Sequence, residues 1–259
     1  MGKKMSCSHA VFTLLLLAPC ENGGGETMDT AIAESLASPA RLESDRKNDA
    51  LRRPDLVLEF FEIEPGMTVL DLFSGAGYYT EIVSRIVGEN GKVLAHNNEA
   101  YLAYAKDDIA ERYSGDRLAN VEHVTAEANS LELPSNTFDA ALAMLTWHDF
   151  YYLDPENGWP DIDEKLVVRK LCSALKPGAV LGVTDHVATA GSDAENSAQN
   201  LHRIDPQRIR NDFSDSCFKY EGEINVLRNP DDDLTQPMFA KGIRGQTDRV
   251  VYKFRKKQE

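Results

Sequence analysis

Residues 69–80, with the sequence VLDLFSGAGYYT, decide the fold. The apolar run Thr68–Phe73 predicts a buried strand. Gly75 and Gly77 then form a tight turn, and the apolar residues of Tyr79–Val87 recur at helical spacing, which predicts a helix. A glycine-rich turn between a buried strand and a helix lets a ligand approach the backbone, at the carboxyl end of the strands where open α/β sheets bind ligands. The stretch therefore predicts a ligand-binding α/β domain.

The rest of the chain alternates strand and helix patterns without an internal repeat. Helical spacing of apolar residues marks Leu102–Tyr113, Ile162–Leu175 and Pro206–Ser214. Strand-like runs lie at Val93–His96, Phe138–Leu145, Val180–Thr184, Phe218–Leu227 and Val250–Phe254. Alternation of this kind predicts a mostly parallel sheet with helices on both faces.

The glycine turn admits several kinds of ligand. No Gly-Lys-Ser/Thr follows it, so it is not a P-loop, and it lacks the third glycine of the dinucleotide fingerprint. A dinucleotide-binding dehydrogenase is therefore a disfavoured alternative, which failure to bind NAD would dismiss. A turn that only packs helix on strand is the other alternative. Because the strand, the helix and the acidic Asp71 agree, ligand binding is the favoured interpretation.

The motif at 69–80 resembles motif I of class I S-adenosylmethionine-dependent methyltransferases. The wider pattern is similar to a subgroup of exported, predicted bacterial methyltransferases, over about Arg41 to Lys257. The supporting pieces are Arg53-Pro54, Gly75–Thr80, Gly91–Ala95, Leu133-Pro134, Phe138-Asp139, Leu175–Gly178, Asp185-His186 and Leu201–Asp205. The resemblance implies a Rossmann-like, seven-stranded α/β sheet with the last strand antiparallel. It also implies S-adenosylmethionine as cofactor and methyl transfer as activity.

The resemblance also assigns cofactor contacts. Asp71 corresponds to the family's acid near the methionine amino group. The backbone of Ser74, Gly75 and Gly77 corresponds to the turn that faces the methionine and ribose. Glu127 and Ala128 correspond to the pair that binds the adenine. Asn97 stands where the family has the acid that holds the ribose hydroxyls. An amide offers one uncharged acceptor oxygen, so it should hold a diol less tightly. Phe73 stands where the family usually has glycine, which narrows the turn.

The reactive side of the pocket is expected from the loop 146–152. His148 is the candidate general base near neutral pH, and Asp149 would orient it or the substrate. The alternative is that both residues cap or anchor the loop. Further rim candidates are Asp185, His186, His202 and Arg203. The mechanism we expect is direct in-line methyl transfer to a small-molecule nucleophile, in which positioning matters more than proton transfer.

Aromatic side chains are frequent around this loop. They are Trp147, Phe150, Tyr151, Tyr152 and Trp159. They indicate a flat or apolar substrate, and packing of the core and lid is an equally good explanation.

Composition limits the partners. The 259 residues include 42 Asp and Glu against 28 Lys and Arg, a formal net charge of −14. Such a surface repels phosphate backbones, so a nucleic-acid substrate is not expected. The one dense basic run, at 253–257, is expected to be a solvated tail. The sequence does not set the oligomeric state.

The N-terminus resembles an export signal. Lys3 and Lys4 precede the short apolar run Val11–Ala18, which is far below the ~20 residues of a membrane-spanning helix. We therefore expect a signal peptide at 1–20, a flexible linker at 21–40 and the methyltransferase domain at 41–259, with a periplasmic or membrane-anchored location. The segment 17–20 resembles a lipobox that would lipidate Cys20, although Pro19 departs from it; an ordinary cleaved signal is the alternative.

The four cysteines do not form a metal motif. No CxxC or Cys/His spacing occurs, so no metal site is expected. Cys172, within a helical pattern, and Cys217, in a turn, are expected to be packing residues. Export would permit a disulfide between them, which the sequence cannot show.

A second class of function stays open at this stage. An exported chain would meet little cofactor made in the cytoplasm, and Phe73 and Asn97 weaken the expected site. A non-catalytic ligand-binding protein that keeps the methyltransferase fold is therefore the alternative to an enzyme.

Overall fold

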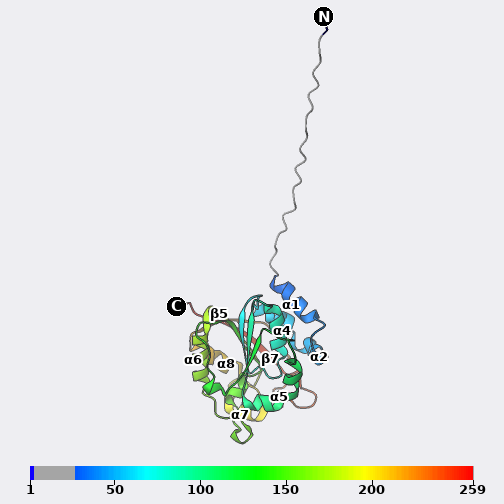
Figure 1. Cartoon of the computed structure of the whole chain (residues 1–259). Helices are drawn as coiled ribbons and strands as arrows, with labels where there is room; N and C mark the ends of the chain where they lie inside the picture. Colours follow the sequence, from blue (N-terminus) through cyan, green and yellow to red (C-terminus); the bar gives the residue numbers. More distant parts are fainter. Residues whose placement is uncertain (3–26, 259) are drawn as a thin grey trace.

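The computed structural model describes residues 1–2 and 27–258 of the chain, and a single sheet lies at its centre (Figure 1). The strands are β1 (Thr68–Leu72), β2 (Lys92–Asn97), β3 (Val121–Thr125), β4 (Phe138–Met144), β5 (Leu175–His186), β6 (Phe218–Glu223) and β7 (Arg249–Lys256). They lie in the order β3-β2-β1-β4-β5-β7-β6. Strands β1 to β5 are parallel, and β7 is antiparallel to both neighbours. The expected Rossmann-like, seven-stranded sheet with an antiparallel last strand is confirmed.

Helices cover both faces of the sheet. They are α1 (Met28–Ala37), α2 (Glu43–Arg52), α3 (Pro54–Phe60), α4 (Tyr78–Val87), α5 (Glu99–Arg112), α6 (Glu164–Ala174), α7 (Ala194–Leu201) and α8 (Pro206–Ser214), with short 3₁₀ turns η1 (Ala128–Ser130), η2 (Trp147–Tyr151) and η3 (Pro155–Asn157). Apolar residues of α1, α3 and α4 share one core with the sheet. Those of α6, α7, α8 and η2 share the core on the opposite face.

Strand β4 explains why the sheet is buried on both sides. Its sequence FDAALAM is almost continuously apolar, and successive side chains of a strand point to opposite faces. Ala141 and Ala143 contribute to one core, whereas Ala140, Leu142 and Met144 contribute to the other. A central parallel strand covered by helices on both faces has this composition.

The strand order reverses between β1 and β4. From β1 the chain continues to β2 on one side, and β4 lies on the other side. Open α/β sheets bind ligands at such a reversal, beyond the carboxyl ends of the strands. Two loops meet there: Phe73–Gly77 follows β1, and Leu145–Tyr151 follows β4. The reversal therefore places the glycine turn and the His148 loop at one edge of the sheet.

The expected linker at 21–40 is wrong for residues 28–37, which form helix α1. Ala31 and Ile32 are buried in the core under α4, and the Ser35 hydroxyl donates to the Ile82 carbonyl at 2.9 Å. Thr27 caps the helix by accepting from the Thr30 amide. Apolar residues three and four positions apart give this short helix one buried face, so the folded domain begins before residue 41.

The expected signal peptide lies outside the described residues, as does its Cys20. Among the residues that the structure does describe, no helix is both long enough and apolar enough to span a bilayer.

The basic run at 253–257 is not the solvated tail that its composition indicated. Lys253 lies in β7, and its ammonium contacts the Glu62 carboxylate at 2.6 Å. Arg255 pairs with both Glu62 and Glu221. Lys253 and Arg255 therefore form ion pairs, and Lys256 and Lys257 donate to the Leu175 and Ser216 carbonyls.

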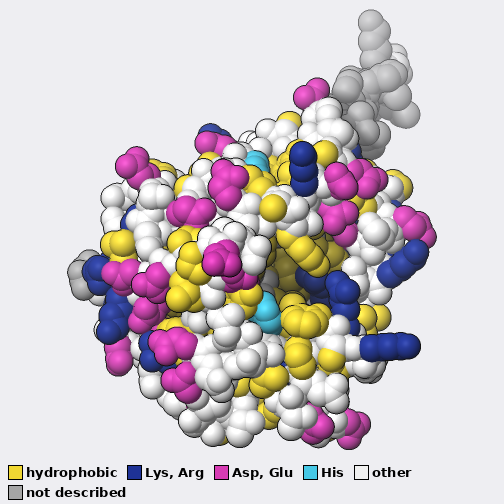
Figure 2. Space-filling view, turned by 90° about the horizontal axis from the view of Figure 1, so that it is seen from below, with side chains coloured by type: hydrophobic (Ala, Val, Ile, Leu, Met, Phe, Trp, Pro, Cys, Tyr) yellow, Lys and Arg dark blue, Asp and Glu magenta, His cyan; other side chains and the backbone are white. Residues whose placement is uncertain are grey.

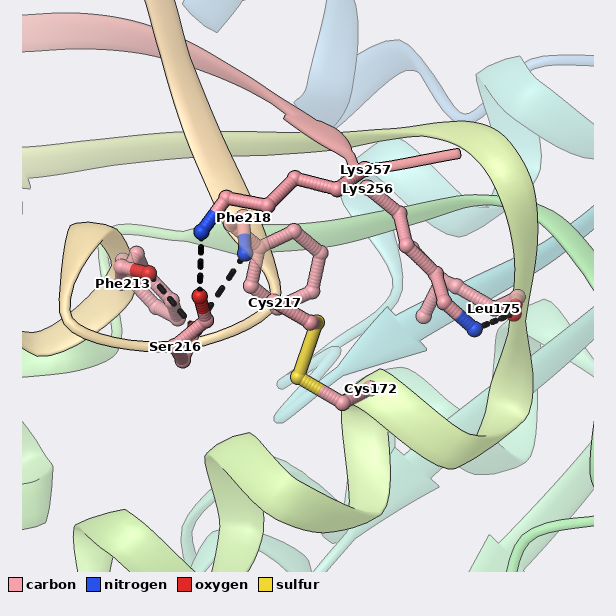
Figure 3. Close-up of a disulfide and its surroundings, with 8 residues drawn as sticks. All are labelled: Cys172, Leu175, Phe213, Ser216, Cys217, Phe218, Lys256 and Lys257. Atoms are coloured by element: carbon pink, nitrogen blue, oxygen red, sulfur yellow. Dashed lines mark hydrogen bonds between the residues drawn. A yellow bond between two sulfur atoms is a disulfide. The ribbon is translucent and has the colours of Figure 1, made fainter. Parts of the chain in front are cut away.

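Cys172 and Cys217 form a disulfide, the pairing that the sequence left open (Figure 3). It ties α6 to the turn before β6, across a sequence separation of 45 residues. The same turn is held by Lys257, whose ammonium donates to the Ser216 carbonyl at 2.7 Å. Both cysteines are consumed by this bond, so neither is a free thiol.

Reduction of the disulfide should destabilise the domain. Cross-linking residues this far apart restricts the unfolded chain, and its loss typically costs about 2–4 kcal/mol. Urea unfolding of the wild type with and without reductant should show that loss, and the Cys172→Ser/Cys217→Ser variant should match the reduced wild type and ignore reductant. An unfolding midpoint that reductant leaves unchanged in the wild type would contradict the pairing.

Candidate functional site

Asp71 lies at the end of β1 and is buried, with 1% exposure. Its Oδ2 atom accepts a 2.6 Å hydrogen bond from the Thr80 hydroxyl, on the first turn of α4. Burial raises the pKa of Asp71 to about 6, against the lowering effect of that hydrogen bond. At neutral pH the carboxyl group is therefore mostly ionised, which is the state that would hold an ammonium group.

Asn97, at the end of β2, braces the glycine turn. Its side-chain oxygen accepts from the Gly75 amide at 2.8 Å, and its side-chain nitrogen donates to the Gly75 carbonyl at 2.9 Å. Asn97 is fully buried. Both ends of the amide bond the Gly75 backbone, and the nitrogen also lies 3.3 Å from His123 Nε2. Because the side chain is buried among these partners, in this conformation Asn97 does not offer a ribose the contact that was expected. A carboxylate could not replace it, because it has no donor for the carbonyl.

Several polar atoms at this edge have no partner. The buried Ser74 hydroxyl, the Asn98 amide nitrogen and the Glu127 Oε2 atom make no hydrogen bond within the described part of the chain. Ala128, next to Glu127, is buried where η1 begins. Buried polar groups are normally satisfied, so a cluster of unsatisfied ones indicates a ligand that bonds them. The three groups follow β1, β2 and β3, and together they offer hydrogen-bond donors and acceptors of the kind that a polar ligand such as a nucleoside would bond.

Arg112 covers the turn from α5, a role that the sequence did not reveal. Its guanidinium donates to the Ala76 carbonyl, to both oxygens of Asp45 on α2 at 2.8 and 3.1 Å, and to Glu81 on α4 at 2.5 Å. The Arg112 side chain is 2% exposed. On a helix of mixed charge such an arginine looks like a solvated surface residue, so no sequence signal marks it.

Gly77 is required beneath this arginine. Its φ is +81°, and a Cβ atom there would lie 2.7 Å from Arg112 Cδ. Gly75, with φ +57°, faces the Tyr101 ring, which a Cβ atom would approach only to 3.8 Å. The two glycines therefore differ, because a side chain leaves no room for a Cβ atom at Gly77 but does leave room at Gly75.

Tyr101 links the glycine turn to the His148 loop. Its ring stacks on Phe73 with centroids 5.1 Å apart, and its hydroxyl donates to Asp149 Oδ2 at 2.5 Å. Phe73 adopts φ +52°, a conformation that glycine occupies more readily. The aromatic residue at position 73 thus packs beside the turn instead of leaving it open.

His148 and Asp149 lie together on η2 and are nearly fully buried. The His148 Nδ1 atom is 2.7 Å from Asp185 Oδ1, and its backbone amide donates to Asp185 Oδ2 at 2.8 Å. Its Nε2 atom is 3.2 Å from Asp149 Oδ1. Burial opposes the charged ring, but the Asp149 and Asp185 carboxylates outweigh it and raise the pKa of His148 to about 9.

Because Nδ1 faces Asp185 and Nε2 faces Asp149, the two carboxylates favour the imidazole form protonated on both nitrogens, and such a ring cannot accept a further proton. The general-base role expected for His148 therefore does not fit this geometry, because Asp185 at the end of β5 and Asp149 together hold the proton. The expectation that Asp149 and Asp185 lie near His148 does fit.

The other rim candidates separate in the structure. His202 lies at the C-terminal end of α7, and its Nδ1 atom is 3.6 Å from Asp149 Oδ1. His186 instead pairs with the Thr247 hydroxyl at 2.6 Å. Arg203 is fully buried against Asp232, at 2.8 Å. Of these three, only His202 has a ring nitrogen close to Asp149, whereas the His186 ring lies edge-to-face with His148, with centroids 5.8 Å apart.

The aromatic residues also divide into two groups. Trp147 and Tyr151 donate to Asp212 on α8, at 2.9 and 2.6 Å, and belong to the core. Tyr152 and Trp159 pack edge-to-face with ring centroids 5.5 Å apart, and Trp159 also contacts Tyr101. The second group gives this edge of the sheet a partly exposed aromatic wall. A pocket of about 550 Å³ lies beside η2 and α7, and Tyr152 is part of its lining.

The family to which the chain belongs follows from a comparison with protein families. A family model described as a methyltransferase domain matches residues 63–243. The chain belongs to this methyltransferase-domain family. The matched range includes the glycine turn, the braced Gly75 and the His148 loop, so the site just described lies within the family domain.

Individual relatives agree with the family. UbiE of Escherichia coli O1:K1 / APEC, the ubiquinone/menaquinone biosynthesis C-methyltransferase, is 36% identical over 124 residues. That alignment covers 48% of this chain and 44% of UbiE, so the chain spans less than half of this curated relative. A SAM-dependent methyltransferase from Aquifex aeolicus is 25% identical, with a TM-score of 0.55 over 87% of this chain and 97% of that chain. Family and fold imply S-adenosylmethionine as the cofactor.

The methyltransferase fold also carries other chemistry. The [4+2]-cyclase SpnF shares the fold, with a TM-score of 0.55, 19% identity and coverage of 90% of this chain and 93% of that chain. Fold alone therefore does not assign the reaction, which has to be argued from the site.

The buried Asp71 should give stability a characteristic pH dependence. In the folded state the pKa of Asp71 is raised from 3.8 to about 6. The stability that its protonated carboxyl group contributes is therefore fully present below pH 3.8 and is lost as the pH rises through 6. Relative to the wild type, Asp71→Asn should gain up to about 3 kcal/mol in unfolding free energy between pH 3.8 and pH 7. Urea unfolding across this range measures the gain.

The exposed Asp108, on α5, supplies the matched control. Asp108→Asn should change the unfolding free energy by a similar amount at every pH. An Asp71→Asn curve parallel to that of the wild type would show that Asp71 titrates normally in the folded protein.

Proposed function

We propose that this protein transfers the methyl group of S-adenosylmethionine to a small-molecule acceptor. The observation that carries the proposal is the set of unpartnered buried polar atoms on Ser74, Asn98 and Glu127, at the strand-order reversal beside the Gly75 turn. The family membership and the solved relative support the same reaction class.

Each cofactor-facing residue has a distinct task in this proposal. The ionised Asp71 takes the ammonium group, and Glu127 with the Ala128 amide takes the adenine. Gly75 and Gly77 present backbone, and Asn97 acts through Gly75 by fixing its peptide. S-adenosylmethionine, when bound, supplies an electrophilic methyl group on a positively charged sulfur. The protein then mainly aligns donor and acceptor at ~3–3.5 Å and excludes water.

The acceptor side is the aromatic wall with His148 and Asp149. Tyr101, Tyr152 and Trp159 offer ring faces and edges, which suit a flat, apolar acceptor. The UbiE relative is a C-methyltransferase of ubiquinone/menaquinone biosynthesis, and 44% of it aligns with this chain. His148 and Asp149 position the acceptor in this proposal, since the protonated ring is no base.

Binding and turnover test the proposal together. The wild type should bind S-adenosylmethionine in calorimetry and release S-adenosylhomocysteine when offered a panel of hydroxylated aromatic and quinol acceptors. Gly77→Ala should weaken binding at least tenfold, because its Cβ atom would collide with Arg112. The matched control is Gly115→Ala, which also has positive φ but meets open space.

The outcomes separate the two classes of function. Binding without product from any acceptor would favour the non-catalytic binding protein over the enzyme. If the wild type and Gly77→Ala bind S-adenosylmethionine with equal affinity, the glycine turn is not the cofactor site.

We also propose that the protein is exported and belongs to the exported subgroup that its sequence resembles. Lys3, Lys4 and the apolar run to Ala18 support export. The Cys172–Cys217 disulfide supports it independently, because such bonds persist mainly in oxidising compartments. Lipidation of Cys20 is the finer proposal.

Fractionation of the native bacterium tests the location. The protein should appear outside the cytoplasm with Cys172 and Cys217 resistant to alkylation, and a palmitate analogue should label the wild type but not Cys20→Ser. A full-length cytoplasmic product with free thiols would contradict export, whereas an unlabelled exported protein would remove only the lipid anchor.

A further inference from the structure

Two histidines and a carboxylate converge at the His148 loop. The atoms are His148 Nε2, Asp149 Oδ1 and His202 Nδ1, and the three residues offer ligand atoms that all lie within 4.8 Å of one another. Asp149 Oδ1 is central, at 3.2 Å from His148 Nε2 and 3.6 Å from His202 Nδ1. The residues come from two separate elements, η2 and the end of α7.

These separations match the spacing of ligands around a metal ion. Imidazole nitrogen and carboxylate oxygen bind zinc at about 2.0–2.2 Å, which sets neighbouring ligand atoms about 3–3.5 Å apart. Two of the three separations already lie near that range. We propose that His148, Asp149 and His202 bind one divalent transition-metal ion, a site that the spacing of histidines and cysteines in the sequence did not indicate.

The outer contacts of two ligands support this assignment. Asp185 holds His148 Nδ1 at 2.7 Å and so directs Nε2 towards Asp149 and His202. Without the ion, Nε2 carries a proton; a bound ion takes the place of that proton, which is released to solvent. Tyr101 donates to Asp149 Oδ2 at 2.5 Å, which leaves Oδ1 for the ion. Metal-binding histidines usually donate their second ring nitrogen to a carboxylate in this way, and ligating carboxylates are themselves hydrogen-bonded.

The donor set selects the kind of ion. Two imidazoles and one carboxylate suit zinc and other first-row transition ions, whereas magnesium and calcium prefer oxygen ligands. Three protein ligands leave at least one coordination position open, as in catalytic zinc sites. Cys172 and Cys217 are joined in the disulfide and do not compete for the ion.

The cluster has a route to solvent through His202. The His202 side chain is 22% exposed and packs against Tyr152 and the exposed Phe239. Figure 2, which views the molecule from the end where α5 and α7 lie in Figure 1, shows a hollow with histidine and hydrophobic side chains at its surface. An ion could therefore enter without unfolding the core.

The open coordination position would face the proposed acceptor side. Tyr101 contacts Asp149 with its hydroxyl and Phe73 with its ring, so one side chain separates the ion from the glycine turn. An oxygen of the acceptor could occupy the open position and be held there. This role rests on the proposed methyl transfer, but binding of the ion does not.

Metal binding is measured on the untagged full chain after treatment with a chelator and dialysis. Zinc titration by calorimetry should show one site that depends on His202, and cobalt should give visible absorption bands from the same site. His202→Asn should lose that site, with at least a 100-fold lower affinity, while asparagine still tolerates the left-handed conformation at the helix end. Asp185→Asn should lower the affinity about 10–100-fold.

His123→Asn is the matched control, because His123 lies on β3 outside the cluster. It should bind zinc as the wild type does, and circular dichroism should show every variant folded. The proposal is overturned if the wild type binds no ion, or if His202→Asn binds as tightly as the wild type. The first of these outcomes would leave the cluster as a protonated histidine between two carboxylates. Neither outcome depends on methyltransferase activity.

Discussion

The reversal of strand order between β1 and β4 is the constraint on which the rest of the site depends. From β1 the chain continues to one side, and β4 lies on the other side; open α/β sheets bind ligands beyond the carboxyl ends of strands at such a reversal. The glycine turn leaves β1 there, and the His148 loop leaves β4. Tyr101 spans the two, with its ring on Phe73 and its hydroxyl on Asp149. The groups proposed to bind donor and acceptor are thus neighbours because of topology, although they are distant in sequence.

Buried charges attach peripheral segments to this edge. Arg112 joins α2 to α4 through Asp45 and Glu81, directly over Gly77. Arg203 ties the long connection between β6 and β7 to the end of α7 through Asp232. Buried ion pairs add little net stability over apolar packing. Removing one partner, however, leaves the other charge buried and unpaired, which lowers the unfolding free energy by about 3–5 kcal/mol. Their effect here is positional: they fix which segments cover the site.

The fold could be predicted because it depends on local patterns. The periodicity of 69–87 and the alternation after it are properties of neighbouring residues, and they correctly anticipated the sheet and the helices on both faces. Helix α1 was missed because its short apolar spacing follows a glycine-rich stretch that resembles a tether.

The site could be predicted only in part, since side-chain roles depend on tertiary partners. Asp71 and the two glycines lie in the motif and at the expected place. The Asn97 side chain bonds the Gly75 backbone, and the Asp185 carboxylate, at the end of β5, stabilises the protonated form of His148. Arg112 and Tyr101 look in sequence like the exposed face of a helix. No local pattern could bring His202 to Asp149, because that contact depends on how α7 packs on η2.

The central claim is that the edge of the sheet at the glycine turn is the cofactor site. A crystal structure of the protein soaked with S-adenosylhomocysteine tests it most directly. The account predicts the ligand along the Phe73–Gly77 turn, with its amino group at Asp71 and hydrogen bonds to the unpartnered atoms of Ser74 and Glu127. A saturating soak that leaves this turn unchanged, with the ligand absent or bound elsewhere, would contradict the account.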